Sequence, residues 1–114
     1  MNKIKLCTEN LGKPITAPDG YQAWKAEDVR KIMEQAQELN WMVLGGDVIN
    51  PDGSFHYCNW HYTPDPNISL ESNVNAAVET CLKYIANFVN RNGDDYYYTI
   101  VMSDAYRNGA CWVL

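Results

Sequence analysis

The chain has 114 residues, 46% of them hydrophobic, so it is long enough for a single domain over residues 1–114 and too apolar for a disordered segment. Its net charge of −5 speaks against nucleic-acid binding, which requires a basic face, and suits a protein that attracts a basic partner. Its apolar runs are much shorter than the roughly 20 residues of a membrane-spanning helix, and the N-terminus lacks the apolar core of a signal peptide.

The first forty residues predict one clear helix. Residues 2–11 carry apolar side chains at helical spacing and predict a short helix, although an extended segment fits equally well. The prolines and the glycine of residues 13–24 indicate a loop. From Ala26 onward, apolar residues recur with the period of an amphipathic helix that ends near Asn40, and its buried face would comprise Val29, Ile32, Met33, Ala36 and Leu39.

The next segment predicts a β-hairpin. Trp41–Ile49 and Ser54–Tyr62 have the composition of two strands, and the turn sequence NPDG of residues 50–53 joins them. Pro51 presets the backbone angle φ of the first turn position, and Gly53 accepts the positive φ that closes such a loop.

A second helix and further strands follow. Two prolines end the hairpin, and Ser69 can cap a helix over Leu70–Asn92 that stops at Gly93. Residues 94–103 are rich in aromatic and β-branched side chains and predict a third strand. A turn at residues 108–109 leads to a short apolar end that can form a last strand. The buried stripe of the second helix would comprise Val74, Ala77, Val78, Cys81, Ile85, Phe88 and Val89.

The order of these elements indicates the fold class. Helices interspersed with strand pairs that short turns connect are typical of α+β domains. We therefore expect an α+β fold with a mainly antiparallel sheet of three to four strands and with helices packed on one face.

The alternation of side chains would divide the hairpin into two faces. If residues 50–53 form the turn, Asp47 stands opposite His56 and Gly45 opposite Cys58. The face under the helices would comprise Leu44, Val48, Phe55 and Tyr57. The other would comprise Asp47, His56, Cys58, Trp60 and Tyr62. The adjacent glycines, Gly45 and Gly46, indicate either a shallow groove for a partner or a bend that lets a helix pack closely.

Reactive side chains in the hairpin suggest a metal or thiol site. Strand alternation, however, points His61 away from His56 and Cys58, and only Asp47 could add a fourth ligand. His56 and Cys58 are two apart on a strand, roughly 7 Å at their bases, which is too far for a ready proton relay. The four cysteines are widely spread, which indicates reduced thiols in a cytoplasmic protein. We therefore predict no metal, cofactor or catalytic residue, and a small enzyme or ligand-binding module centred on residues 43–62 is the alternative.

Aromatic and acidic side chains indicate a protein-binding surface more strongly than they indicate chemistry. Exposed tyrosine and tryptophan beside carboxylates are typical of protein interfaces, while the same rings can equally fill a two-sided core. The candidates for contact with a partner are Asp47, His56, Trp60, Tyr62, Asp65, Asp94 and Asp95.

Two motifs carry a resemblance to a known family. The stretch "LGGDVINPDG" (residues 44–53), followed by "YCNWHY" (residues 57–62), resembles the immunity protein 40 family of bacterial polymorphic toxin–immunity systems. The likeness runs from Tyr21 to Ser103 and includes the "YYYTIV" strand, whereas the terminal "YRNGACWVL" matches nothing in the family pattern. The matching signature residues are Gly45, Gly46, Asp47, Asn59 and Trp60.

The resemblance implies a function in bacterial competition. A member of this family would be a cytoplasmic protein that binds and neutralises one cognate toxin domain and so protects the producing cell. The resemblance implies neither catalysis nor a cofactor. It therefore favours a toxin inhibitor that acts by stoichiometric occlusion, with the toxin domain as its protein partner.

Overall fold

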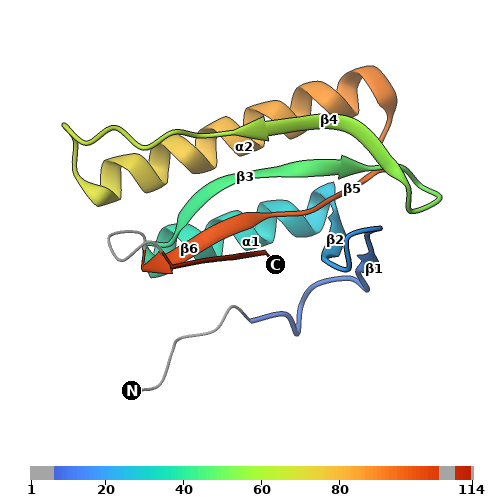
Figure 1. The fold of residues 1–114 in the computed structure, drawn as a ribbon, viewed down its shortest axis with the longest axis horizontal. Helices are drawn as coiled ribbons and strands as arrows, with labels where there is room; N and C mark the ends of the chain where they lie inside the picture. The colour runs from blue at the N-terminus through green and yellow to red at the C-terminus, as the bar shows by residue number, and fades with distance from the viewer. Residues whose placement is uncertain (1–6, 106–109, 114) are drawn as a thin grey trace.

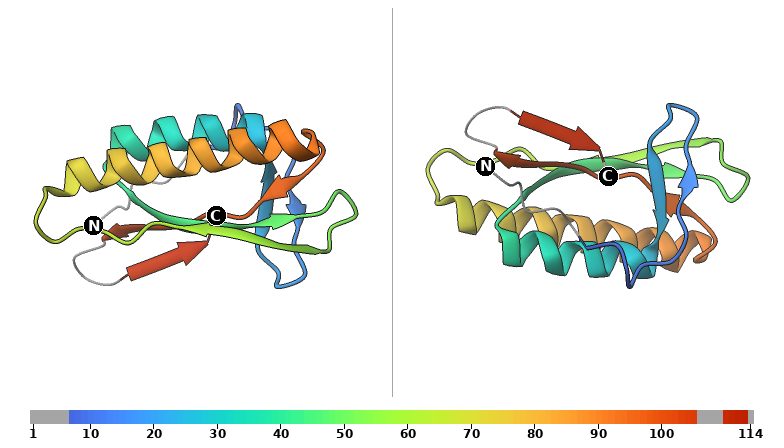
Figure 2. Two further views of the ribbon diagram at one scale, coloured as in Figure 1. Left: turned by 90° about the horizontal axis from the view of Figure 1, so that it is seen from above. Right: turned by 90° about the horizontal axis from the view of Figure 1, so that it is seen from below.

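Two helices lie side by side against one face of an antiparallel sheet (Figure 1, Figure 2). The computed structural model describes residues 7–105 and 110–113, and the side chains of residues 7–103. Within these residues it contains two helices and seven strands, and every strand pair is antiparallel. In this part of the chain, no helix is both long and apolar enough to cross a bilayer. The expected α+β class is confirmed, while the sheet has more strands than the expected three to four.

Both helices have the bounds that the sequence predicts. α1 spans Ala26–Leu39 and ends at Asn40, whose φ of 58° is left-handed, and α2 spans Leu70–Asn92. The Ser69 hydroxyl accepts a hydrogen bond from the amide of Ser72 (3.1 Å) and thereby caps α2. The predicted apolar stripes face the core: every member is buried except the last of each stripe, which is partly buried.

Strand β3 lies at the centre of the sheet (Figure 1). β4 pairs with one side of β3, while β5 and β6 pair in succession with the other side. β2 and β1 extend the sheet from β5, and β7 extends it from β6. Among the described residues β4 has no second strand neighbour, so its outer side is an edge of the sheet. The strands are β1 (Ile15–Thr16), β2 (Gln22–Lys25), β3 (Met42–Ile49), β4 (Phe55–His61), β5 (Tyr97–Tyr98), β6 (Val101–Ala105) and β7 (Ala110–Val113).

The N-terminal expectations are wrong in part. The segment 13–24, expected as a loop, holds the β1–β2 hairpin, since its prolines flank β1 and remove no ladder donor from it. The amide of Gly20 donates to the carbonyl of Ala17 (2.9 Å) and closes the connecting turn. Residues 7–11 of the expected first helix contain no helix, and residues 2–6 lie outside the described residues.

The C-terminal strands follow the expectation with one interruption. The strand predicted over residues 94–103 is broken at Thr99 and Ile100 into β5 and β6. The predicted last strand is present as β7, which pairs with β6. The turn predicted at residues 108–109 lies outside the part of the chain that the structure describes.

The core fills the space between the helices and the sheet, and a second, smaller cluster lies on the opposite face. This second cluster contains Ala17, Ala23 and Ile49, with Phe55 and Tyr97 packed against it. Because neighbours along a strand alternate, Val48 faces the helices while Ile49 faces the second cluster. The β1–β2 hairpin thus covers part of the sheet face that the helices leave open.

The register of the β3–β4 hairpin differs from the expected one. The predicted turn forms, with the amide of Asn50 donating to Ser54 O (2.8 Å), but Asp47 stands opposite Asn59 and not His56. Three residues of β4, from His56 to Cys58, face the single residue Val48 in a β-bulge, and the central residue of the three, Tyr57, has a φ of 73°.

The bulge also reverses part of the expected division of faces. His56, Cys58, Trp60 and Tyr62 share a face, as predicted, but this face lies against α2, as their contacts described below establish. Phe55, expected under the helices, packs in the second cluster, and Tyr57 is 92% exposed. The extra residues inserted into β4 shift the strand against β3, so the expected cross-strand pairing fails.

Candidate functional site

A pocket between β4 and α2 collects most of the reactive side chains of the hairpin. The His56 ring lies edge-on to the rings of Phe88 (5.2 Å between centroids) and Tyr96 (5.4 Å), and Trp60 stacks on Tyr84 (5.4 Å). The pocket has a volume of about 490 Å³. We call it the β4–α2 pocket; its lining residues are His56, Cys58, Tyr84, Asn87, Phe88, Arg91 and Asn92.

The described residues that line the β4–α2 pocket include a histidine, a cysteine and a tyrosine but no carboxylate. Burial, and then the neighbouring Cys58 thiol, raise the pKa of the Tyr84 hydroxyl. The Nδ1 atom of His56 is buried and has no hydrogen-bond partner among the residues that the structure describes. Arg91 is the only Lys, Arg, Asp or Glu among the described residues that line the pocket, so no carboxylate is placed to orient His56 toward Cys58.

The metal ligand set considered for the hairpin is not assembled. His56 and Cys58 face the pocket, whereas His61 is exposed and stands opposite Gly45 in the sheet. Within residues 7–105 and 110–113, no three His, Cys, Asp or Glu side chains come together as metal ligands would. Asp47 is separated from His56 by the register shift described above, so the expected Asp47–His56 pair is wrong.

Gly45 and Gly46 permit a close approach of backbone and ring, and they open no groove. A Cβ on Gly46 would lie 1.9 Å from the carbonyl oxygen of Thr99 and 2.6 Å from Cη2 of Trp60. A Cβ on Gly45, whose φ is +148°, would lie 2.3 Å from the carbonyl oxygen of Trp60. Trp60 is only 6% exposed. The partner groove considered for these glycines is therefore wrong, because neighbouring strands and the indole already occupy the space.

Asp47 lies on the sheet face away from α2. Its amide donates to Thr99 Oγ1 (3.0 Å), and its carbonyl accepts from the Thr99 amide (3.0 Å), which joins the strands where β5 and β6 separate. Burial raises the pKa of its carboxyl group, and the nearby carboxylate of Asp19 raises it further. Among the described residues, no ion pair neutralises either carboxylate.

A buried asparagine that sequence reasoning missed organises the connection between β4 and α2. Asn73 is 5% exposed, and its Oδ1 accepts hydrogen bonds from the Tyr62 hydroxyl (2.8 Å) and the Asp65 amide (2.7 Å). Its Nδ2 donates to the carbonyls of Asp65 (2.9 Å) and Ser69 (3.1 Å). A lone asparagine in a helical stripe gives no sequence signal of this role. Tyr62 and the Asp65 backbone are thus held in the fold.

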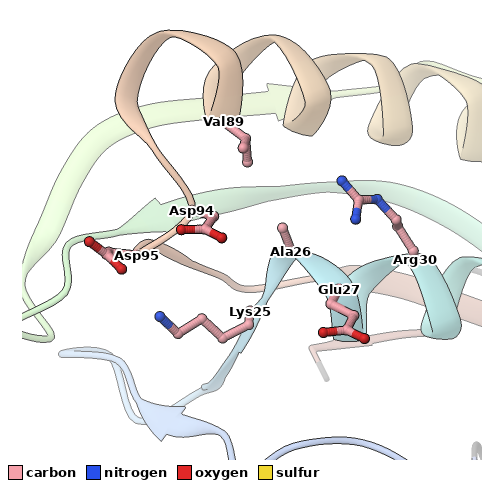
Figure 3. A pocket seen from close by; sticks show the side chains of 7 residues that line it. All are labelled: Lys25, Ala26, Glu27, Arg30, Val89, Asp94 and Asp95. Atoms are coloured by element: carbon pink, nitrogen blue, oxygen red, sulfur yellow. The ribbon is translucent and has the colours of Figure 1, made fainter.

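A second pocket, of about 450 Å³, lies beside the start of α1 and the chain leaving α2 (Figure 3). Asp94 and Asp95 line it from one side, and Lys25, Glu27 and Arg30 contribute further charges. Lys25 Nζ lies 4.7 Å above the ring of Tyr97. No ion pair within 4.0 Å joins these groups in the described part of the chain, so this pocket presents charges of both signs.

The seven side chains predicted to contact a partner therefore occupy separate places. Asp47 faces away from the helices, Asp65 is exposed before α2, and Asp94 and Asp95 line the pocket of Figure 3. The three others lie at the β4–α2 contact, where His56 and Tyr62 are partly buried and Trp60 is buried. Tyr57, the most exposed large hydrophobic side chain among the described residues, was not among the candidates.

Comparison with known proteins identifies the family. A family model described as Immunity protein 40 matches residues 15–102, which include both helices and the β3–β4 hairpin. No curated protein and no solved structure matches the chain. The matched residues cover most of the chain and include every signature residue noted above, so this protein belongs to the immunity protein 40 family.

Proposed function

We propose that this protein is a cytoplasmic immunity protein that binds one cognate bacterial toxin domain and neutralises it by stoichiometric occlusion. The observation that carries the proposal is the family match over residues 15–102. A family of this name is expected to act through a protein partner, and the toxin is the partner that an immunity protein requires.

The charge of the chain supports binding to a basic toxin surface. The net charge is −5, and Asp47, Asp65, Asp94 and Asp95 are each at least partly exposed. Carboxylates on a small inhibitor raise the rate of encounter with a basic partner more than they deepen the final affinity. Rapid capture suits an inhibitor that must act before a toxin reaches its target.

Co-expression tests the proposal directly. The toxin probe is a candidate toxin domain encoded next to this gene, expressed from an inducible promoter with or without the immunity protein. We expect growth arrest with the toxin domain alone and restored growth when both are expressed. Undiminished cell death in the presence of the protein would contradict the proposal.

Titration in vitro separates occlusion from enzymatic inactivation. An inhibitor that occludes the toxin abolishes the toxin's activity at one equivalent and leaves the toxin chemically intact. The toxin therefore regains its activity when the complex is dissociated. Complete neutralisation by a few per cent of an equivalent would refute occlusion and favour an enzyme.

A thiol-dependent enzyme or ligand-binding module at the β4–α2 pocket is the second candidate. It rests on the shared location of His56, Cys58 and Tyr84 in one pocket. Under the leading proposal, Cys58→Ser and His56→Gln protect cells as well as the parent protein, provided that both variants fold. Loss of protection with an intact complex would favour the second candidate, as would one equivalent of metal bound to protein purified without a histidine tag.

A further inference from the structure

The outer side of β4 combines a free strand edge with an exposed face. In the described part of the chain, β4 pairs with β3 alone, so its other edge offers unpaired backbone groups to a partner. Three of its side chains, Tyr57, Asn59 and His61, are exposed, and Asn59 stands opposite Asp47. We call these four residues the β4 rim. It lies on the side of the strand away from the β4–α2 pocket.

Tyr57 is the most unusual residue of the β4 rim. Its side chain is 92% exposed, and its φ of 73° lies in the left-handed region that a bulky residue rarely adopts. Neither burial nor backbone preference therefore explains a tyrosine at this position. A glycine or asparagine would fit the bulge better. A protruding tyrosine is, in contrast, a frequent anchor of protein interfaces.

The carboxylate of Asp47 in the β4 rim indicates which kind of partner fits this surface. Asp47 and Asp19 lie close enough for their carboxylates to repel each other, and no described cation pairs with either. A lysine or arginine from a partner would relieve this repulsion. An arginine can in addition stack on a tyrosine ring, and Tyr57 lies two residues before Asn59, the cross-strand partner of Asp47. A partner surface that presents arginine therefore suits both Asp47 and Tyr57.

We infer that the β4 rim is the surface that contacts the toxin, with Tyr57 as its anchor and Asp47 as the receptor for a basic side chain. The inference rests on the proposed function and adds the place and chemistry of the contact. The occupant is a toxin surface that presents arginine or lysine and an apolar depression for the tyrosine ring. The free edge of β4 further allows an extended segment of the toxin to pair with it.

The test measures affinity for the toxin domain after its own active site has been inactivated by mutation. Calorimetry gives the dissociation constant for the parent protein and for Tyr57→Gly. We expect Tyr57→Gly to be at least as stable as the parent, because glycine tolerates the positive φ and little contact is lost. We expect its affinity to fall at least about tenfold, as for an interface anchor.

The matched control is Asn40→Gly, which places glycine at the other non-glycine residue with positive φ in the described chain. Asn40 ends α1 and is not part of the β4 rim, so its variant should bind as the parent does. A parallel loss of affinity in both variants would overturn the inference, because the effect would then follow the backbone change. Asp47→Asn should reduce the dependence of affinity on salt, since one ionic contact is removed.

The outcomes separate the inference from the proposed function. A parent protein that neither binds nor neutralises the toxin domain overturns both. A parent that binds while Tyr57→Gly binds within twofold of it overturns the β4 rim alone and leaves the immunity function standing. Tenfold weaker binding by Tyr57→Gly with unchanged binding by Asn40→Gly supports the rim.

Discussion

Replacement of Gly46 by alanine should disrupt the centre of the sheet. The new methyl group would lie 1.9 Å from the carbonyl oxygen of Thr99, where ordinary contact begins at 3.4 Å. The segment that holds Thr99, between β5 and β6, must therefore move away from β3 by about 1.5 Å, or the backbone of Gly46 must rotate, because a backbone carbonyl cannot move as a side chain does. The indole of Trp60, 2.6 Å away, closes the other side.

The loss of stability expected for Gly46→Ala can be estimated from the contacts that the new methyl group disrupts. Overpacking of a tight core costs about 1–3 kcal/mol. The two hydrogen bonds between Asp47 and Thr99 contribute roughly 1 kcal/mol each, and separation of the strands breaks both. We expect the free energy of unfolding to fall by about 3–5 kcal/mol, a large share of the roughly 5–15 kcal/mol typical of a domain.

Urea denaturation followed by tryptophan fluorescence measures this loss, with Gly53→Ala as the control. Gly53 has a positive φ of 91°, but a Cβ there meets nothing within 4 Å. Its replacement should cost only the conformational penalty of about 1 kcal/mol. If Gly46→Ala and Gly53→Ala lose similar stability, the close approach of Thr99 and Trp60 to Gly46 does not limit the fold.

Three further predictions concern single side chains. Asn73→Ala leaves the Tyr62 hydroxyl and the Asp65 amide without their acceptor, so urea unfolding should show a loss of about 2–3 kcal/mol. Burial raises the pKa of the Cys81 thiol to about 12, so this thiol should react slowly in the folded protein. At pH 8, a maleimide should label the exposed Cys7 quickly and Cys81 only after unfolding, and mass spectrometry of the peptides measures both. The pKa of Asp47 is raised in the folded state, so its ionisation opposes folding above the ordinary value of 3.8. Asp47→Asn should therefore raise the thermal midpoint at pH 7, and this gain should vanish below that value; an equal gain at both pH values would contradict the electrostatic cause.

The helices could be predicted from the sequence because their signals are local. The stripe of α2 repeats with the helical period, and both of its ends carry residues with the required backbone or capping properties, Ser69 and Gly93. The short strands β1 and β2, of two and four residues, lack such a signal. They exist because β2 pairs with β5, more than seventy residues later in the chain, and no local pattern encodes that pairing.

The sequence indicates which segment carries the reactive side chains of the candidate site, but not which way those side chains face. The composition of residues 43–62 singles out this segment, and its NPDG turn forms as expected. The bulge at Tyr57 is invisible in the sequence, because a tyrosine gives no indication of a positive φ. That bulge breaks the predicted Asp47–His56 pair and leaves Tyr57 exposed. An insertion of this kind is fixed by the tertiary packing of His56 and Trp60 on α2.

The residues that carry the family resemblance divide into two groups with opposite expected effects. Gly45 and Gly46 let the backbone of β4, the Thr99 carbonyl and the Trp60 ring approach β3, and Trp60 stacks on Tyr84 of α2. Replacement of any of these three signature residues should therefore remove stability and protection together. Asp47 and Asn59 form a cross-strand pair on the other face, and Tyr57 lies two residues before Asn59 in β4. Two residues of this face oppose folding: Asp47 through its raised pKa, and Tyr57 through a left-handed backbone that costs roughly 1–2 kcal/mol.

The stability of the fold does not explain residues that oppose folding, and such conflicts tend to mark functional surfaces. The substitutions Tyr57→Gly and Asp47→Asn should therefore each yield a more stable protein that protects cells less well. This sign pattern cannot arise from damage to the fold, because damage lowers stability and protection together. If both variants gain stability and protect cells at least as well as the parent, the proposed contact of the β4 rim with a toxin is refuted.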